Sequence, residues 1–262
     1  MRILVLTKPV PDPAAAAERL GPDFRLDRAA SPTVVNGNDE YALEAALQLV
    51  EKHGGEVAIL TMAPANAVDT MRKALAMGAL RGVLVTDASL EGADLPTTIR
   101  VLAAAAAKES FDLLLAGLDT SDGNAGVVAA GIAARLGLPL LSAAASIEPD
   151  PDAGRVTVRR LSAKGYDVVS ASMPAVISGT QVLGTPRYPS LKGIMAARSR
   201  EIATHAVGDL EGEALVPADG RWATEVVAAE RPPARAAGRK VTGAPADAAR
   251  EIADFLADRR II

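Results

Sequence analysis

Short apolar runs alternate with longer amphipathic segments over the first 146 residues of the chain. Residues 2–7 form the first run, which is rich in aliphatic residues and ends where Lys8 and Pro9 stop a strand. From residues 38–40 onward, apolar residues recur at helical spacing until Gly54 and Gly55 end the helix. The same rhythm predicts three more strand–helix pairs and a further strand: residues 56–61 with 65–77, 82–86 with 94–108, 112–116 with 124–136, and 140–146.

These strands are apolar along their whole length and alternate with helices, so they predict a parallel sheet with helices on both faces. Residues 155–161 and 167–173 alternate between apolar and polar residues on the two sides of residues 163–165. This pattern is typical of an antiparallel hairpin. Pro174 then leads into a buried strand at residues 175–179. The expected fold class is therefore α/β: a doubly wound, mostly parallel sheet with one antiparallel hairpin.

The last part of the chain is predicted to be an extended arm. We expect an α/β domain at residues 1–204 and an arm at residues 205–262, with a Pro-rich stretch at 231–235. Within the arm, only residues 247–259 show a convincing helical pattern, with one apolar face. A segment with so little core buries too little apolar area to offset the entropy of ordering it. We therefore expect the arm to wrap a partner.

Composition removes several classes of function. The chain has no Cys and only two His, which excludes disulfides, thiolate metal sites and a cysteine nucleophile. A net charge of -4 and an aromatic content of 3% make nucleic acid an unexpected partner. The apolar run at residues 3–6 is too short for a signal peptide, and no run approaches the ~20 residues of a membrane span. We expect a cytoplasmic protein that is not membrane-embedded.

Ligands of doubly wound sheets bind beyond the carboxyl ends of the strands, so the loops there are candidate sites. Three loops suit this role, at residues 8–12, 35–39 and 117–126. The third, rich in Gly, Ser, Asp and Asn, would present backbone N–H groups to a phosphate at a helix start. A plain capped helix explains that loop equally well. The chain has no Gly-x-Gly-x-x-Gly after the first strand, no P-loop and no nucleophile elbow, so we find no catalytic constellation.

Several strings resemble the electron-transfer flavoprotein beta subunit over essentially the whole chain. Two are the most diagnostic, RKALAMGA and PRYPSLKGIMAA, because a generic α/β sheet does not require those residues in that order. The strings are KPVPD at residues 8–12, NDEYALEAA at 38–46, RKALAMGA at 72–79, MPAVIS at 173–178 and PRYPSLKGIMAA at 186–197.

The resemblance implies an adenine-nucleotide alpha-hydrolase-like fold and a heterodimer. In this family the beta subunit binds AMP and has no catalytic residues of its own, while the alpha subunit holds most of a shared FAD. The FAD accepts electrons from dehydrogenases such as acyl-CoA dehydrogenases and passes them to a quinone oxidoreductase. By position, the implied AMP pocket consists of Leu6, Asn36, Gly37, Asn38, Asp39, Met62, Asp122, Gly123, Asn124, Ala125, Gly126, Val127 and Val128.

The resemblance also implies a recognition loop at residues 184–197, whose Leu191 anchors in a hydrophobic pocket of the dehydrogenase. Tyr188, Ile194 and Met195 flank this anchor. The arm would embrace the alpha subunit. A Leu packed on its own domain is the alternative for Leu191.

The chain departs from the family pattern at Asn38, where an aromatic residue is common, and at residues 164–167, where an acidic hairpin is common. Three alternatives remain. A bifurcating-type beta subunit would hold a second FAD in place of AMP, and the Asp122-Gly123 pair partly matches its loop. A stand-alone adenine-nucleotide regulator would form a homodimer. An ATP-pyrophosphatase-like enzyme would need a phosphate loop that residues 8–12 do not provide.

Overall fold

The computed structural model describes residues 1–15, 20–28, 32–210, 214–230, 233, 237–238 and 240–262. It divides into two units, Met1–Val227 and Ala228–Ile262. The predicted Pro-rich stretch at residues 231–235 lies, apart from residue 233, outside the described residues.

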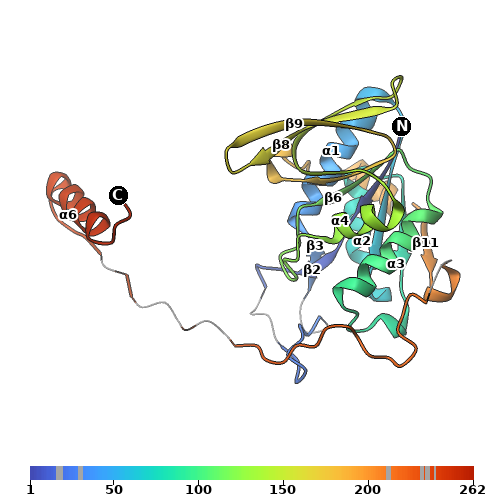
Figure 1. Cartoon of the computed structure of the whole chain (residues 1–262), viewed down its shortest axis with the longest axis horizontal. Coiled ribbons are helices and arrows are strands. Elements are labelled where there is room, and N and C mark those ends of the chain that lie inside the picture. The colour runs from blue at the N-terminus through green and yellow to red at the C-terminus, as the bar shows by residue number, and fades with distance from the viewer. Residues whose placement is uncertain (16–19, 29–31, 211–213, 231–232, 234–236, 239) are drawn as a thin grey trace. The chain divides into compact units, whose positions relative to one another are not determined.

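In the first unit, the apolar runs form a sheet that has nine strands among the described residues (Figure 1). The first seven strands in sheet order are parallel, the eighth pairs antiparallel with the seventh, and the ninth pairs antiparallel with the eighth. This confirms the predicted fold class. The order is β11 (Ile202–His205), β5 (Arg81–Val85), β4 (Glu56–Met62), β1 (Arg2–Leu6), β6 (Leu113–Gly117), β10 (Ala175–Gly179), β7 (Leu140–Asp150), β8 (Arg155–Ser162) and β9 (Gly165–Ser172).

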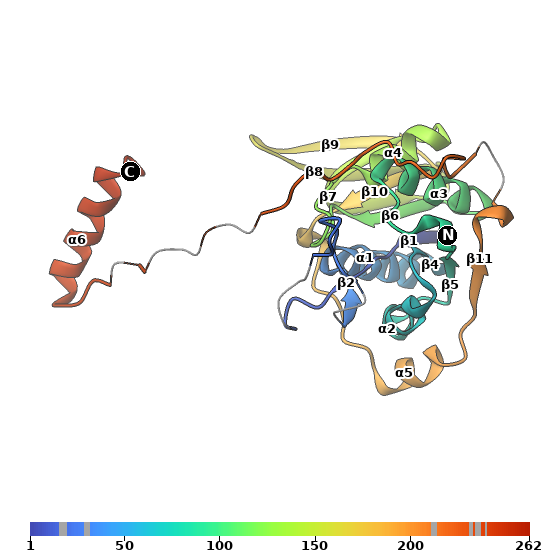
Figure 2. The same cartoon turned by 90° about the horizontal axis from the view of Figure 1, so that it is seen from below.

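Helices cover both faces of this sheet, as Figure 2 shows. One face packs against α1 (Gly37–His53) and α2 (Val68–Met77), with α5 (Leu191–Ala197) on the outer side of α2, and the other face packs against α3 (Leu95–Lys108) and α4 (Val128–Leu136). Alternate side chains of each strand enter the two cores because successive Cβ atoms of a strand point to opposite faces. In β1, for example, Ile3 and Val5 join one core, and Leu4 and Leu6 join the other.

The remaining elements are short, except for the helix of the second unit. They are β2 (Pro9–Pro11), which pairs antiparallel with β3 (Thr33–Val35), the 3₁₀ turns Ala65–Ala67, Ala88–Leu90, Gln181–Leu183 and Val207–Asp209, and α6 (Pro245–Asp258).

Several local predictions differ from the structure. Helix α4 begins at Val128 and not at residue 124, because Asn124 (φ 44°) and Gly126 (φ 65°) adopt left-handed conformations that interrupt a helix. Helix α5 and strand β11 are not predicted, because seven and four residues are too few to show a period. His205 therefore ends a strand paired with β5 rather than lying in an arm.

The described residues between 206 and 227 belong to the first unit, and some of them contact α3. Leu210 and Leu215 are buried in the same core as α3 and α4. Lys108 Nζ donates to the carbonyl of Asp209 at 2.7 Å, and Arg100 Nε donates to the carbonyl of Leu215 at 3.3 Å. The described part of this segment is thus held by the α/β unit itself.

A chain that ends at Val227 should keep the unfolding free energy of the α/β unit. A chain that ends at His205 should lose about 4 kcal/mol of that unfolding free energy. The loss follows because each buried leucine, Leu210 and Leu215, contributes about 2 kcal/mol through apolar burial. Urea unfolding of the two truncated chains beside the full chain measures the difference. Equal midpoints for all three chains would contradict it.

The second unit contains α6, which agrees with the helix predicted at residues 247–259. Ile252 and Phe255 on this helix are exposed, and the Arg259 guanidinium lies 4.7 Å from the centroid of the Phe255 ring. Across both units, none of the helices in the described ranges is long and apolar enough to cross a bilayer.

Candidate functional site

Strands β1, β4 and β6 end at the same edge of the sheet, and most of the predicted site residues follow them. Leu6, the last residue of β1, is buried, and Met62, the last residue of β4, is half-buried. Just beyond β1, Thr7 and the β4 residue Thr61 share a hydrogen bond of 2.7 Å between their hydroxyl oxygens. The edge thus offers apolar side chains beside a small polar pair.

Two asparagines tie the turn before α1 to the loop after β6. The buried Asn36 donates from Nδ2 to the carbonyl of Asp119 at 2.9 Å, and its Oδ1 accepts from the backbone N–H of Ser121 at 3.2 Å. Asn38 Nδ2 donates to the same Asp119 carbonyl at 3.3 Å. Because both amides are engaged within the protein, they shape the loop and hold it against α1.

Asp39 is a buried carboxylate in the first turn of α1. Its Oδ2 accepts from the backbone N–H of Lys8 at 2.9 Å. Burial raises the pKa of Asp39 to about 7, and hydrogen bonds from Asn36, Lys8 and Gly117 offset part of that increase. Gly117, the last residue of β6, has no room for a side chain: a Cβ there would lie 2.6 Å from Asp39 Oδ1.

The raised pKa of Asp39 predicts a pH-dependent stability. Above about pH 4 an unfolded Asp has lost its proton, while native Asp39 keeps it up to about pH 7. Since the native state binds more protons in this window, the unfolding free energy should fall by about 2 kcal/mol from pH 5 to pH 7. Asp39→Asn should remove most of that slope in urea titrations at each pH. Identical slopes in the two proteins would disprove the raised pKa.

Asp122 is the charged residue of the third candidate loop. Its side chain is 1% exposed and contacts Lys8 Nζ at 2.9 Å and Arg28 Nη2 at 2.5 Å. Burial alone would raise the pKa of Asp122, but Lys8 and Arg28 lower it to about 2. The backbone N–H of Gly123 also donates to Asp122 Oδ1, at 2.7 Å. Asp122 therefore neutralises two cations and does not project toward solvent as a free acid.

Residues 123–127 are exposed and precede α4. Asn124 and Gly126 have positive φ, and the backbone N–H of Asn124 donates to the carbonyl of Thr120 at 2.8 Å. Turns that contain left-handed residues can gather successive N–H groups into an anion-binding concavity. Of the residues predicted to face a phosphate, Asp122 to Val127 thus precede the helix, and Val128 lies in its first turn.

Sequence reasoning placed Lys8 and Gly117 in the candidate loops at residues 8–12 and 117–126 but gave neither a role, and it missed Arg28. Lys8 and Asp122 are 114 positions apart, so no local pattern reports their contact. A basic residue directly after the first strand was the available signal for Lys8. Gly117 at the end of a strand was the signal for a close backbone approach.

The predicted docking residues form a second, separate feature around α5. The exposed fractions of Tyr188, Leu191, Ile194 and Met195 are 96%, 78%, 44% and 56%. Leu191, Ile194 and Met195 stand at i, i+3 and i+4, so they share one face of α5. We call these four residues the α5 apolar surface. The helix itself packs on α2 (Figure 2).

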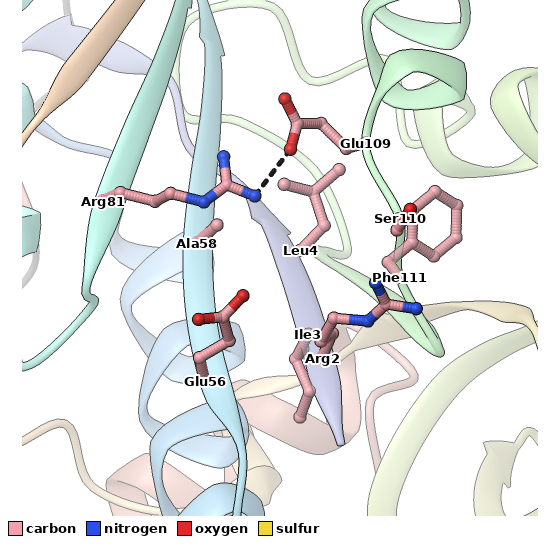
Figure 3. Close-up of a pocket in the computed structure, with 9 residues that line it drawn as sticks. All are labelled: Arg2, Ile3, Leu4, Glu56, Ala58, Arg81, Glu109, Ser110 and Phe111. Carbon is pink, nitrogen blue, oxygen red and sulfur yellow. Dashed lines mark hydrogen bonds and ion pairs between the residues drawn. The ribbon is translucent and has the colours of Figure 1, made fainter.

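The opposite, amino edge of the sheet holds a small pocket (Figure 3). Its volume of about 10 Å³ is near the minimum for one water molecule, so no nucleotide fits there. The Arg81 guanidinium at its rim donates to Glu109 Oε2 at 2.6 Å. The pocket is lined by Arg2, Ile3, Leu4, Glu56, Ala58, Arg81, Glu109, Ser110 and Phe111.

Comparison with known proteins names the family. The family model for the electron transfer flavoprotein domain matches residues 23–210. The chain is 35% identical to the electron transfer flavoprotein subunit beta of Mycobacterium leprae, over 99% of each chain. The chain belongs to the electron transfer flavoprotein beta-subunit family. It is also 33% identical, over 100% of each chain, to the electron transfer flavoprotein subunit beta of Thermoanaerobacterium thermosaccharolyticum.

A third relative, Protein FixA of Azorhizobium caulinodans, is 38% identical over 80% of this chain and 76% of its own. The electron transfer flavoprotein domain match includes the turn before α1, the loop after β6 and the α5 apolar surface. Membership in this family confirms the resemblance noted in the sequence and indicates an electron carrier that works with a flavin. In the described parts of the chain, no group of three or more His, Asp or Glu side chains is placed to hold a metal ion.

Proposed function

We propose that this chain is the beta subunit of a heterodimeric electron-transfer flavoprotein. The complex accepts electrons from dehydrogenases such as acyl-CoA dehydrogenases and passes them through FAD to a quinone oxidoreductase. The observation that carries this proposal is the full-length similarity to subunits that bear this name. The α5 apolar surface supports it, because an exposed Leu191 fits a small anchor that releases its partner quickly.

We propose AMP as the nucleotide of this subunit, bound at the carboxyl edge of the sheet. Leu6 and Met62 are the apolar residues that would lie against the adenine. The backbone N–H groups of residues 125–127 would hold the phosphate, because Lys8 and Arg28 are already paired with Asp122. In this proposal AMP braces the fold and takes no part in electron transfer.

The FAD supplies the redox chemistry and is held mainly by the alpha subunit. The present chain contributes binding and positioning: the nucleotide edge stabilises the α/β unit, and α5 presents the docking residues. His53 lies at the end of α1, away from the nucleotide edge. His205 lies at the end of β11, outside the proposed pocket. We propose no catalytic residue in this chain.

The exposed apolar face of α6 is proposed to contact the alpha subunit, together with the rest of residues 228–262. Ile252 and Phe255 leave large apolar areas exposed on a helix whose own unit provides no buried side chain among its described residues. Such a face is stabilised by a partner surface. We place the complex in the cytoplasm.

Mass spectrometry of the nucleotides released from the co-purified heterodimer tests the proposal. One AMP and one FAD per heterodimer are expected. Two FAD and no AMP would overturn the AMP assignment in favour of the bifurcating type. The chain expressed alone should be colourless and should release AMP on denaturation. A stable homodimer that never associates with a flavin subunit would instead indicate an adenine-nucleotide regulator.

A further inference from the structure

The α5 apolar surface is highly exposed, yet the chain on both sides of it is fixed to the α/β unit. Arg187 comes directly before Tyr188, the first residue of this surface. Arg200 follows α5 by three residues. Both arginines direct their guanidinium groups into the protein, as does Arg72 from α2.

Arg187 fixes the entry to the surface through two glutamates of α1. Its Nε donates to Glu44 Oε2 at 2.7 Å, and its Nη2 donates to Glu44 Oε1 at 3.0 Å. Nη1 and Nη2 donate to the two carboxylate oxygens of Glu51 at 2.5 and 3.1 Å. The backbone N–H of Arg187 adds a bond of 3.1 Å to Glu44 Oε2. Such forked pairs restrict orientation as well as distance.

The contact with Glu44 resists opening because Glu44 is only 4% exposed. Burial would raise the pKa of Glu44, but hydrogen bonds from Arg187 and Gln48 lower it below its usual value. Moving Arg187 away would leave a buried carboxylate without its cation, which is strongly unfavourable. The backbone at residue 187 is therefore held on α1.

Hydrogen bonds from the guanidinium groups of Arg72 and Arg200 fix the exit. Arg72 Nη1 donates to the carbonyl of Ala197 at 2.7 Å and also contacts the carbonyl of Arg200. Arg200 Nη1 donates to the carbonyl of Leu75 at 2.6 Å. Between the two ends, a Cβ on Gly193 would lie 2.3 Å from the carbonyl oxygen of Ala76, so α5 lies directly on the backbone of α2.

We propose that Arg187, acting through Glu44 and Glu51, is a positioning residue that preorganises the α5 apolar surface for the dehydrogenase. This inference rests on the proposed docking function of Leu191. A surface that is already ordered loses less conformational entropy when a partner binds, so its affinity is higher for the same contact area. Arg187 itself is turned toward α1 and gains its effect through the placement of Leu191.

A double-mutant cycle on the heterodimer tests this role, with an acyl-CoA dehydrogenase reduced by its acyl-CoA substrate as the probe. The KM for the heterodimer should rise about 10-fold for Arg187→Ala and about 30-fold for Leu191→Ala, with kcat within about twofold of wild type. The KM of the double variant should match that of Leu191→Ala, because the placement of the surface has little effect on affinity once its anchor is removed.

Multiplying effects in the double variant, about 300-fold, would overturn the positioning role. An unchanged KM for Arg187→Ala beside a raised KM for Leu191→Ala would also overturn it, and would leave the docking function standing. An unchanged KM for Leu191→Ala would instead refute the docking function and this inference with it.

Two further variants protect the test against a simple loss of folding or charge. Arg187→Lys keeps a cation beside Glu44 but lacks the fork that joins both glutamates, so its KM should rise about threefold. Arg198→Ala removes an exposed arginine from the same segment, and its effect should multiply with that of Leu191→Ala. A KM for Arg187→Lys equal to that of wild type, with Arg187→Ala impaired, would show that charge alone acts and would overturn the proposal.

Discussion

Leu191→Ala is expected to raise the KM for the heterodimer about 30-fold in electron transfer from an acyl-CoA dehydrogenase, while AMP content and heterodimer formation stay unchanged. Leu191 is 78% exposed, so its removal opens no cavity in the α/β unit. A leucine that fills a partner's pocket contributes about 2 kcal/mol, which corresponds to the 30-fold change. Stopped-flow reduction of the bound flavin at varied heterodimer concentration measures it.

Leu80→Ala is the matched control, because Leu80 is also exposed, at 51%, but stands between α2 and β5 and is not one of the four residues of the α5 apolar surface. Its KM should equal that of wild type. Equal KM values for Leu191→Ala and Leu80→Ala would contradict the assignment of α5 to dehydrogenase docking.

Gly117→Ala should destabilise the α/β unit by about 3 kcal/mol and reduce the AMP that co-purifies with the heterodimer. A Cβ at Gly117 would lie 2.6 Å from Asp39 Oδ1 and 2.7 Å from the carbonyl carbon of Asn38. Because one of these atoms is backbone, the start of α1 must move away from the end of β6. That movement separates the turn before α1 from the loop after β6, the two segments proposed to form the pocket.

Gly208→Ala provides the control, since a Cβ there meets no atom within 4 Å. Its unfolding midpoint in urea should stay near that of wild type. A Gly117→Ala variant as stable as Gly208→Ala would show that the contact between β6 and α1 is looser than the structure describes. Normal stability with lost AMP would place the effect in the pocket alone.

Much of the fold could be predicted from the sequence because burial leaves a periodic record within each element. The strands of the parallel sheet are apolar throughout, and the hairpin β8–β9 alternates around its turn, so both were recognisable. The position of β10 between β6 and β7 leaves no such record, because the order of strands depends on how whole elements pack. The short elements α5 and β11 carry too few residues for a period.

The candidate site divides in the same way. The loops at the carboxyl edge follow from the positions of the strands, and family strings in the sequence supplied the pocket and docking residues that remain proposals. The contacts of Asp122 with Lys8 and Arg28, and of Arg187 with Glu44, join residues more than 90 positions apart. The sequence by itself determined the fold class and the family. Only the tertiary structure decided which charges are paired, because pairing depends on distance in space and not on spacing along the chain.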